Sequence, residues 1–124
     1  TTLALSGGHQ FQGADGAGFF ASADTLYSLP AADPVVKGVA SGVAFTHRQD
    51  NGGPFQFFTA PFTLAEGVHR LAYQSQDNVQ NLEVSRCTTA LVDATAPRTA
   101  LTIVGGHRFP GPDATTYYAS SDTR

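Results

Sequence analysis

The chain has 124 residues, a formal net charge of −3 and 14% charged residues, fewer than the roughly 25% of an average soluble protein. Its few Arg and Lys residues are scattered, which argues against a nucleic-acid-binding surface. No apolar run reaches the roughly 18 residues that a membrane-spanning helix needs. A single cysteine cannot form an internal disulfide, so the fold must rest on packing of its many Phe and Tyr residues.

Alternating and aromatic runs interrupted by Gly, Pro, Asn and Asp predict β-structure along the whole chain. We expect strands at residues 2–6, 18–22, 25–32, 43–48, 55–58, 62–64, 68–75 and 82–92. Turns are expected at residues 50–53, 66–67 and 77–81, and a long surface loop at residues 33–42. In the strand at residues 68–75, Leu71 and Tyr73 share the face that we expect to pack between two sheets.

Residues 99–123 repeat residues 1–25 without a gap, and 12 of the 25 aligned positions are identical. The offset of 98 residues is close to the size of an immunoglobulin-like sandwich, roughly 100 residues. Pro97 lies in a segment, residues 93–98, that is typical of a short and semi-rigid linker. We therefore predict one complete unit at residues 1–98, linker 93–98 included, and the N-terminal strands of a second unit at residues 99–124.

Five short motifs follow one another in the first unit and its linker. They are Ser41-Gly42-Val43, Ala60-Pro61-Phe62-Thr63-Leu64, Glu66-Gly67-Val68-His69, Tyr73-Gln74-Ser75-Gln76-Asp77-Asn78-Val79-Gln80-Asn81 and Asp93-Ala94-Thr95-Ala96-Pro97. With these motifs the chain resembles the immunoglobulin-like tandem repeats of large bacterial extracellular proteins. The resemblance implies an antiparallel immunoglobulin-like β-sandwich, an extracellular or cell-surface location, and a structural or adhesive role. It implies no particular ligand.

The first functional hypothesis is a structural repeat module of an extracellular filament, stalk or surface appendage, which assembles head to tail. Its partners would be copies of itself or adjacent repeats of the same polypeptide. One alternative is an adhesin module that binds carbohydrate or a host protein through the aromatic side chains of Phe55, Phe57 and Phe58. Another alternative is an accessory domain of a secreted hydrolase.

The second unit is too short to fold alone, because about two strands bury little apolar surface. Its apolar side chains therefore need a cover, which is either the body of residues 1–98 or another copy of the chain. These side chains are Leu101, Ile103, Phe109, Tyr117 and Tyr118. Two arrangements would supply another unit: covalent continuation of the polypeptide, or exchange of strands between molecules.

Residues suited to catalysis do not form a recognisable pattern, and we expect no enzyme activity. There is no Gly-x-Ser-x-Gly motif, Cys87 has no evident His partner, and the histidines lack zinc-binding spacing. Most acidic residues are Asp in predicted turns, where the carboxylate accepts backbone N–H bonds. The alternative is a calcium ion held at one end of the sandwich. Its ligands would be Asp33, Asp77, Asn78 and Asp93.

Overall fold

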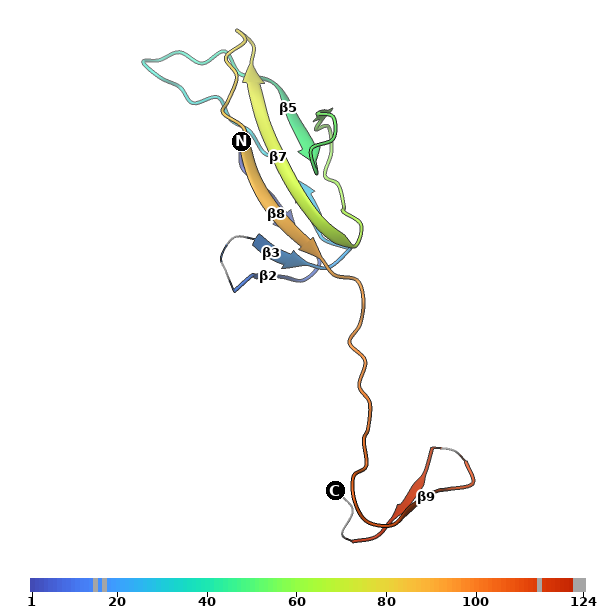
Figure 1. The fold of residues 1–124 in the computed structure, drawn as a ribbon. Coiled ribbons are helices and arrows are strands. Elements are labelled where there is room, and N and C mark those ends of the chain that lie inside the picture. The colour runs from blue at the N-terminus through green and yellow to red at the C-terminus, as the bar shows by residue number, and fades with distance from the viewer. Residues whose placement is uncertain (15, 17, 114, 122–124) are drawn as a thin grey trace.

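The structure is a computed structural model that describes residues 1–14, 16, 18–113 and 115–121 (Figure 1). Asp15 and residues 122–124, the end of the predicted second unit, lie outside the described residues. The described part contains strands and turns and no helix, so the predicted all-β class is confirmed. The strands are β1 (Ala4–Ser6), β2 (Gln10–Gln12), β3 (Gly18–Ala21), β4 (Leu26–Ser28), β5 (Val43–Asp50), β6 (Gln56–Phe57), β7 (Gly67–Asp77), β8 (Arg86–Val92), β9 (Arg108–Pro110) and β10 (Tyr117–Ala119).

The strands form one large sheet and two pairs. The large sheet has the order β2-β3-β8-β7-β5-β6, while β1 pairs with β4 and β9 pairs with β10. All these pairs are antiparallel except β3 and β8, which run parallel with Phe20 opposite Leu91. The sheet is therefore mixed, and the expectation of a wholly antiparallel arrangement was wrong. Parallel neighbours need a long crossover connection, and here most of the body lies between the two strands.

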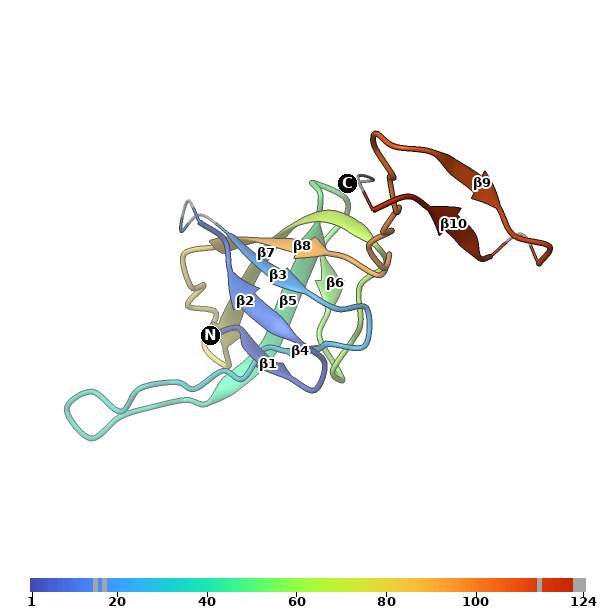
Figure 2. The same ribbon diagram turned by 90° about the horizontal axis from the view of Figure 1, so that it is seen from below.

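The predicted turn at residues 50–53 joins β5 to β6, with positive φ angles of 48° at Asn51 and 73° at Gly52. The predicted loop at residues 33–42 extends away from the body (Figure 2) and has a single bridge between Val36 and Val39. Strand β2 was not predicted, because Phe11 is its only apolar residue and all three of its side chains are exposed. The predicted strand at residues 62–64 is reduced to one bridge between Phe62 and Tyr27.

The core lies between the β1–β4 pair and the inward face of the large sheet. The buried cluster consists of Ala21, Tyr27, Leu64, Leu71, Ala90 and Val92. Leu3, Leu5, Phe19 and Phe62 pack against it and are partly buried. Leu71 and Tyr73 of β7 are both buried while Arg70 is exposed, so the predicted inward face of this strand is confirmed.

Tyr27 is the central side chain of this core and is fully buried. Its ring stacks on Phe62 at a centroid distance of 5.6 Å and lies 6.3 Å from the ring of Phe19. Its hydroxyl has no hydrogen-bond partner among the described residues. Burial raises the pKa of this hydroxyl, because the charged form would lose its hydration. The ring therefore stabilises the core, whereas the hydroxyl carries an uncompensated desolvation cost.

Replacing Tyr27 by Phe should raise the free energy of unfolding by about 1 kcal/mol, because it removes the unpaired hydroxyl and keeps the ring. The matched variant Tyr27→Ala should lose about 3–5 kcal/mol, because it leaves a cavity. Urea unfolding of the three proteins measures both effects. A loss of stability in Tyr27→Phe would mean that the hydroxyl has a bonding partner after all.

Candidate functional site

The strand pair at the C-terminal side, β9–β10, has the same structure as the β2–β3 pair of the body. Phe109 faces Tyr118 in one pair, and Phe11 faces Phe20 in the other. Each residue of the first pair lies 98 positions, the offset of the repeat, after its counterpart in the second. The facing rings stack at centroid distances of 5.1 Å and 4.8 Å. The Gly-Gly pair before each hairpin has positive φ angles in both copies. The internal sequence repeat is therefore matched by a repeat of local structure.

Hydrogen bonds at the open end of each hairpin are also the same. The backbone N–H of His9 donates to Oγ of Ser22 at 2.8 Å, and that of His107 donates to Oγ of Ser120 at 2.9 Å. In the reverse direction, the backbone N–H of each serine donates to the carbonyl of the paired histidine at 2.9 Å. These two histidines thus act through their main chain, which is a structural role.

The two copies differ in how their apolar side chains are covered. In the first copy, Leu3 and Leu5 point inward and pack against the core cluster. Their counterparts are Leu101, which is 83% exposed, and Ile103, which is half-buried. The exposed apolar side chains of the second copy are Leu101, Val104, Phe109, Tyr117 and Tyr118. The second copy therefore has the hairpin of a folded unit, whereas its residues 101–104 form no strand and no core covers them.

An extended segment separates this hairpin from the body (Figure 1). No described strand of the body contacts β9 or β10. The hydrogen bonds between linker and body among the described residues are at its beginning, where the N–H of Asp93 donates to the carbonyl of Ala21 and the hydroxyl of Thr95 donates to Glu66. Of the two covers considered for the second copy, the body of the same chain is therefore not the one used in this structure.

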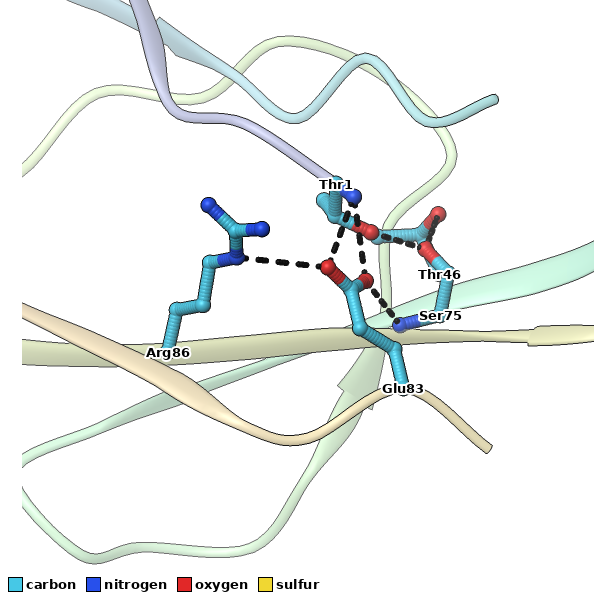
Figure 3. A network of polar contacts seen from close by, with 5 residues as sticks. All are labelled: Thr1, Thr46, Ser75, Glu83 and Arg86. Atoms are coloured by element: carbon cyan, nitrogen blue, oxygen red, sulfur yellow. Dashed lines mark hydrogen bonds and ion pairs between the residues drawn. The ribbon is translucent and has the colours of Figure 1, made fainter. Parts of the chain in front are cut away.

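The start of the first copy is held by the carboxylate of Glu83 (Figure 3). The ammonium of Thr1 donates to both carboxylate oxygens, at 2.9 Å and 3.0 Å, and the backbone N–H of Ser75 adds a bond of 3.2 Å. Nε of Arg86 lies 3.3 Å from Oε1. The hydroxyl of Ser75 contacts the hydroxyls of Thr1 and Thr46. Burial opposes ionisation of Glu83, but these donors outweigh it and lower the pKa of its carboxyl.

A pocket of about 400 Å³ adjoins this network, and Asp33 and Asp77 are among the residues that line it. Oδ2 of Asp33 accepts the backbone N–H groups of Ser41 and Gly42, both at 2.9 Å. Asn78 donates its side-chain amide to the carbonyl of Ser41 at 2.8 Å. Three of the four residues considered for calcium therefore lie around one loop, where two main-chain N–H groups already bind the carboxylate of Asp33.

Asp77 uses its carboxylate within its own turn. Desolvation opposes its ionisation, but N–H donors of Asn81 and Val79 lower the pKa of this carboxyl. Gln80 completes the turn with a φ of 72°, an angle that favours glycine. The predicted turn at residues 77–81 is thus built from Asx-type bonds.

Asp93 lies at the opposite end of the large sheet. Gly67 at the start of β7 faces Val92, whereas Asp77 is the last residue of this 11-residue strand. Because a strand rises about 3.3 Å per residue, Asp93 cannot share an ion with Asp77. The predicted calcium site of four residues is therefore not formed. Across residues 1–121, positions 15, 17 and 114 apart, no three His, Cys, Asp or Glu side chains gather as metal ligands.

The aromatic side chains at residues 55–58 divide between two faces of the sheet. Phe57 and Phe55 are 63% and 43% exposed on the outer face. Phe58 is half-buried and lies 6.4 Å from the ring of Phe62, on the core side. This separation follows from the alternation of side chains along a strand. Of the three residues proposed for ligand binding, Phe55 and Phe57 share an exposed surface and Phe58 does not.

Two residues of β5 that the sequence did not indicate extend this exposed surface. The His47 ring lies 4.5 Å from that of Phe57, and the Phe45 ring lies 5.4 Å from it. On the adjacent strand β7, Gln74 faces His47 and Gln76 faces Phe45. We call Phe45, His47, Phe55 and Phe57 the aromatic surface. Its flanking amides can donate and accept hydrogen bonds, and its rings offer flat apolar area.

Two further side chains that could be chemically reactive, His69 and Cys87, contact neighbouring residues of the body. His69 contacts Oδ2 of Asp50 at 2.7 Å and the carbonyl of Ala65 at 2.9 Å, which fixes the loop before β7. Cys87 is exposed, and Nε of Arg70 lies 3.4 Å from its Sγ. Outward and inward residues alternate along β8, and Cys87 is on the outward side.

Comparisons with protein-family models, curated proteins and solved structures give no match to this chain. No helix of the described residues is long and apolar enough to cross a membrane.

Matched truncations of the two copies should have unequal effects. Leu3→Ala should lower the free energy of unfolding by about 1–3 kcal/mol, because it removes packing against the core. Leu101→Ala should change it by less than about 0.5 kcal/mol, because that side chain is exposed. Chemical unfolding of the 124-residue chain compares them. Equal losses would show that the body covers the second copy in solution.

Proposed function

We propose that this protein is a structural repeat module of an extracellular array, in which successive units join head to tail. The observation that carries the proposal is the second copy of the opening strands, which has the register of the first copy and leaves Leu101 and Tyr117 exposed. Strands of this kind fit a surface like the one that Leu3 and Phe19 cover in the body. The low content of charged residues is consistent with close packing of units. The chain has a binding role in this proposal and no catalytic one.

We also propose that each complete unit is an immunoglobulin-like sandwich. The order β8-β7-β5 in the large sheet corresponds to the order of the last, the penultimate and the third main strand in that fold. The β1–β4 pair, with the bridge from Tyr27 to Phe62, would supply the opposite sheet. An extracellular location is part of the same proposal and rests on the resemblance of the sequence motifs.

Completing the second unit tests the proposal. The extended chain would consist of residues 1–123 followed directly by a second copy of residues 26–98, so that Leu26 of this copy replaces Arg124 in the register of the repeat. We expect the backbone amides of residues 99–104 and 117–119 to exchange with solvent at least about 10-fold more slowly than in the original chain, because the added core closes over them. Hydrogen exchange followed by mass spectrometry measures this change.

A matched control is the extended chain with Leu101→Asp and Ile103→Asp, which places charge where the core should close. It should show the fast exchange of the original chain. If residues 99–119 exchange equally fast in the original and the extended chain, they are not the start of a unit and the head-to-tail proposal fails.

The aromatic surface favours a second candidate function, which is binding of carbohydrate by an adhesin module. Phe57 and Phe55 present exposed rings on a sheet face that also carries Gln74 and Gln76. Apolar rings beside neutral amides suit the apolar faces and hydroxyl groups of sugars, and no acidic side chain belongs to the surface as defined.

Phe57→Ala should weaken retention of the chain on an insoluble polysaccharide by about 10-fold, because exposed aromatic anchors contribute most of the binding energy of such sites. Cellulose, chitin and peptidoglycan would serve as probes in pull-down titrations. Val79→Ala removes a comparably exposed apolar side chain from a distant turn and should have no effect. Equal retention of both variants on every probe would exclude carbohydrate binding to these materials by this surface.

A further inference from the structure

The contacts of Thr1 with Glu83 indicate which groups a preceding unit would contribute at the joint. Thr1 is the counterpart of Thr99 in the repeat, and its side chain is fully buried beside Glu83. When Thr99 occupies the same position in a second unit, its nitrogen belongs to a peptide bond with Arg98. A peptide nitrogen has one hydrogen and no charge, whereas the ammonium of Thr1 donates to both oxygens of Glu83.

We propose that Arg98 of one unit forms an ion pair with Glu83 of the following unit, in the place that the Thr1 ammonium occupies here. This inference rests on the proposed head-to-tail function. It assigns a partner to each side of the joint: the Arg98–Thr99 segment on the side of the linker, and the pocket next to Glu83 on the side of the receiving unit.

The charges around this position favour a cation there. The side chain of Glu83 is 24% exposed and accepts three hydrogen bonds, two from the Thr1 ammonium and one from the N–H of Ser75. It also lies 3.3 Å from Arg86, whose own side chain is 59% exposed. Asp33 and Asp77 line the same pocket. Exchanging an ammonium for a neutral peptide N–H would leave three carboxylates with one guanidinium. A partly buried carboxylate that loses a charged partner destabilises the fold.

Arg98 has the position and the chemistry to supply this charge. It is exposed in the linker and directly precedes Thr99, so its Cα lies about 3.8 Å from that of Thr99. The long Arg side chain reaches several ångströms beyond this, and its planar guanidinium can bind a carboxylate through two N–H groups. One peptide N–H and one guanidinium together restore the donors that the ammonium provides in the first unit.

The chain extended by residues 26–98 after Thr123 tests the pair. We expect Arg98→Gln to increase the opening equilibrium of residues 99–104 about 5-fold at low salt, because a partly buried ion pair is lost. Arg98→Lys should keep most of the protection, since it keeps the charge. Residues 1–6 report on the first unit, where the ammonium is present, and should not change. Peptides from the two copies differ in sequence, so hydrogen exchange with mass detection separates them.

A double-mutant cycle assigns the partner of Arg98. With Glu83→Gln in the appended copy only, Arg98→Gln should have no further effect. The ion pair is excluded if Arg98→Gln and Arg98→Lys increase the opening of residues 99–104 equally. It is also excluded if Arg98→Gln has the same effect when the appended copy carries Glu83→Gln. Neither result contradicts the head-to-tail joining of the units. Failure of the head-to-tail proposal gives a different result, because residues 99–104 are then unprotected before any substitution of Arg98.

Discussion

A strand with an apolar inward face needs a second surface that buries it, and this requirement accounts for both ends of the chain. In the body, Leu3 and Leu5 meet the core that Tyr27 organises. In the repeat of this segment, the same alternation is present and Leu101 is exposed. Positions 1, 3 and 5 keep their character between the copies, whereas positions 2, 4 and 6 differ. The pattern retained is thus the one that packing requires.

Local features of the fold could be predicted from the sequence. The turn at residues 50–53 follows from the φ angles that Asn51 and Gly52 tolerate, and the inward face of β7 follows from alternation. Nonlocal features could not be predicted. The parallel pairing of β3 with β8 depends on how the whole chain returns to one sheet edge. Strand β2 lacks an apolar pattern because neither of its faces is buried.

The candidate sites show the same division between local and nonlocal information. Placing Asp93 near Asp77 required knowing the direction of β7 and β8, and the antiparallel register separates them by the length of a strand. Grouping Phe55 with Phe57 followed from the sequence, whereas Phe45 and His47 join them only through the pairing of β5 with β6. The acidic side chains stabilise turns and loops. Asp33 and Asp77 accept main-chain N–H groups, which leaves fewer carboxylate oxygens for an ion.

In the proposed array, the orientation of successive units would be set by very few residues. The linker is bonded to its own body through Asp93 and Thr95. On the receiving side, Thr99 would be fixed by the hydroxyl and carboxylate network that holds Thr1. Only residues 96–98 remain between these attachments, and the ring of Pro97 restricts both its own φ and the conformation of the residue before it. A joint with so few adjustable torsions would transmit direction from unit to unit, which a filament or stalk requires.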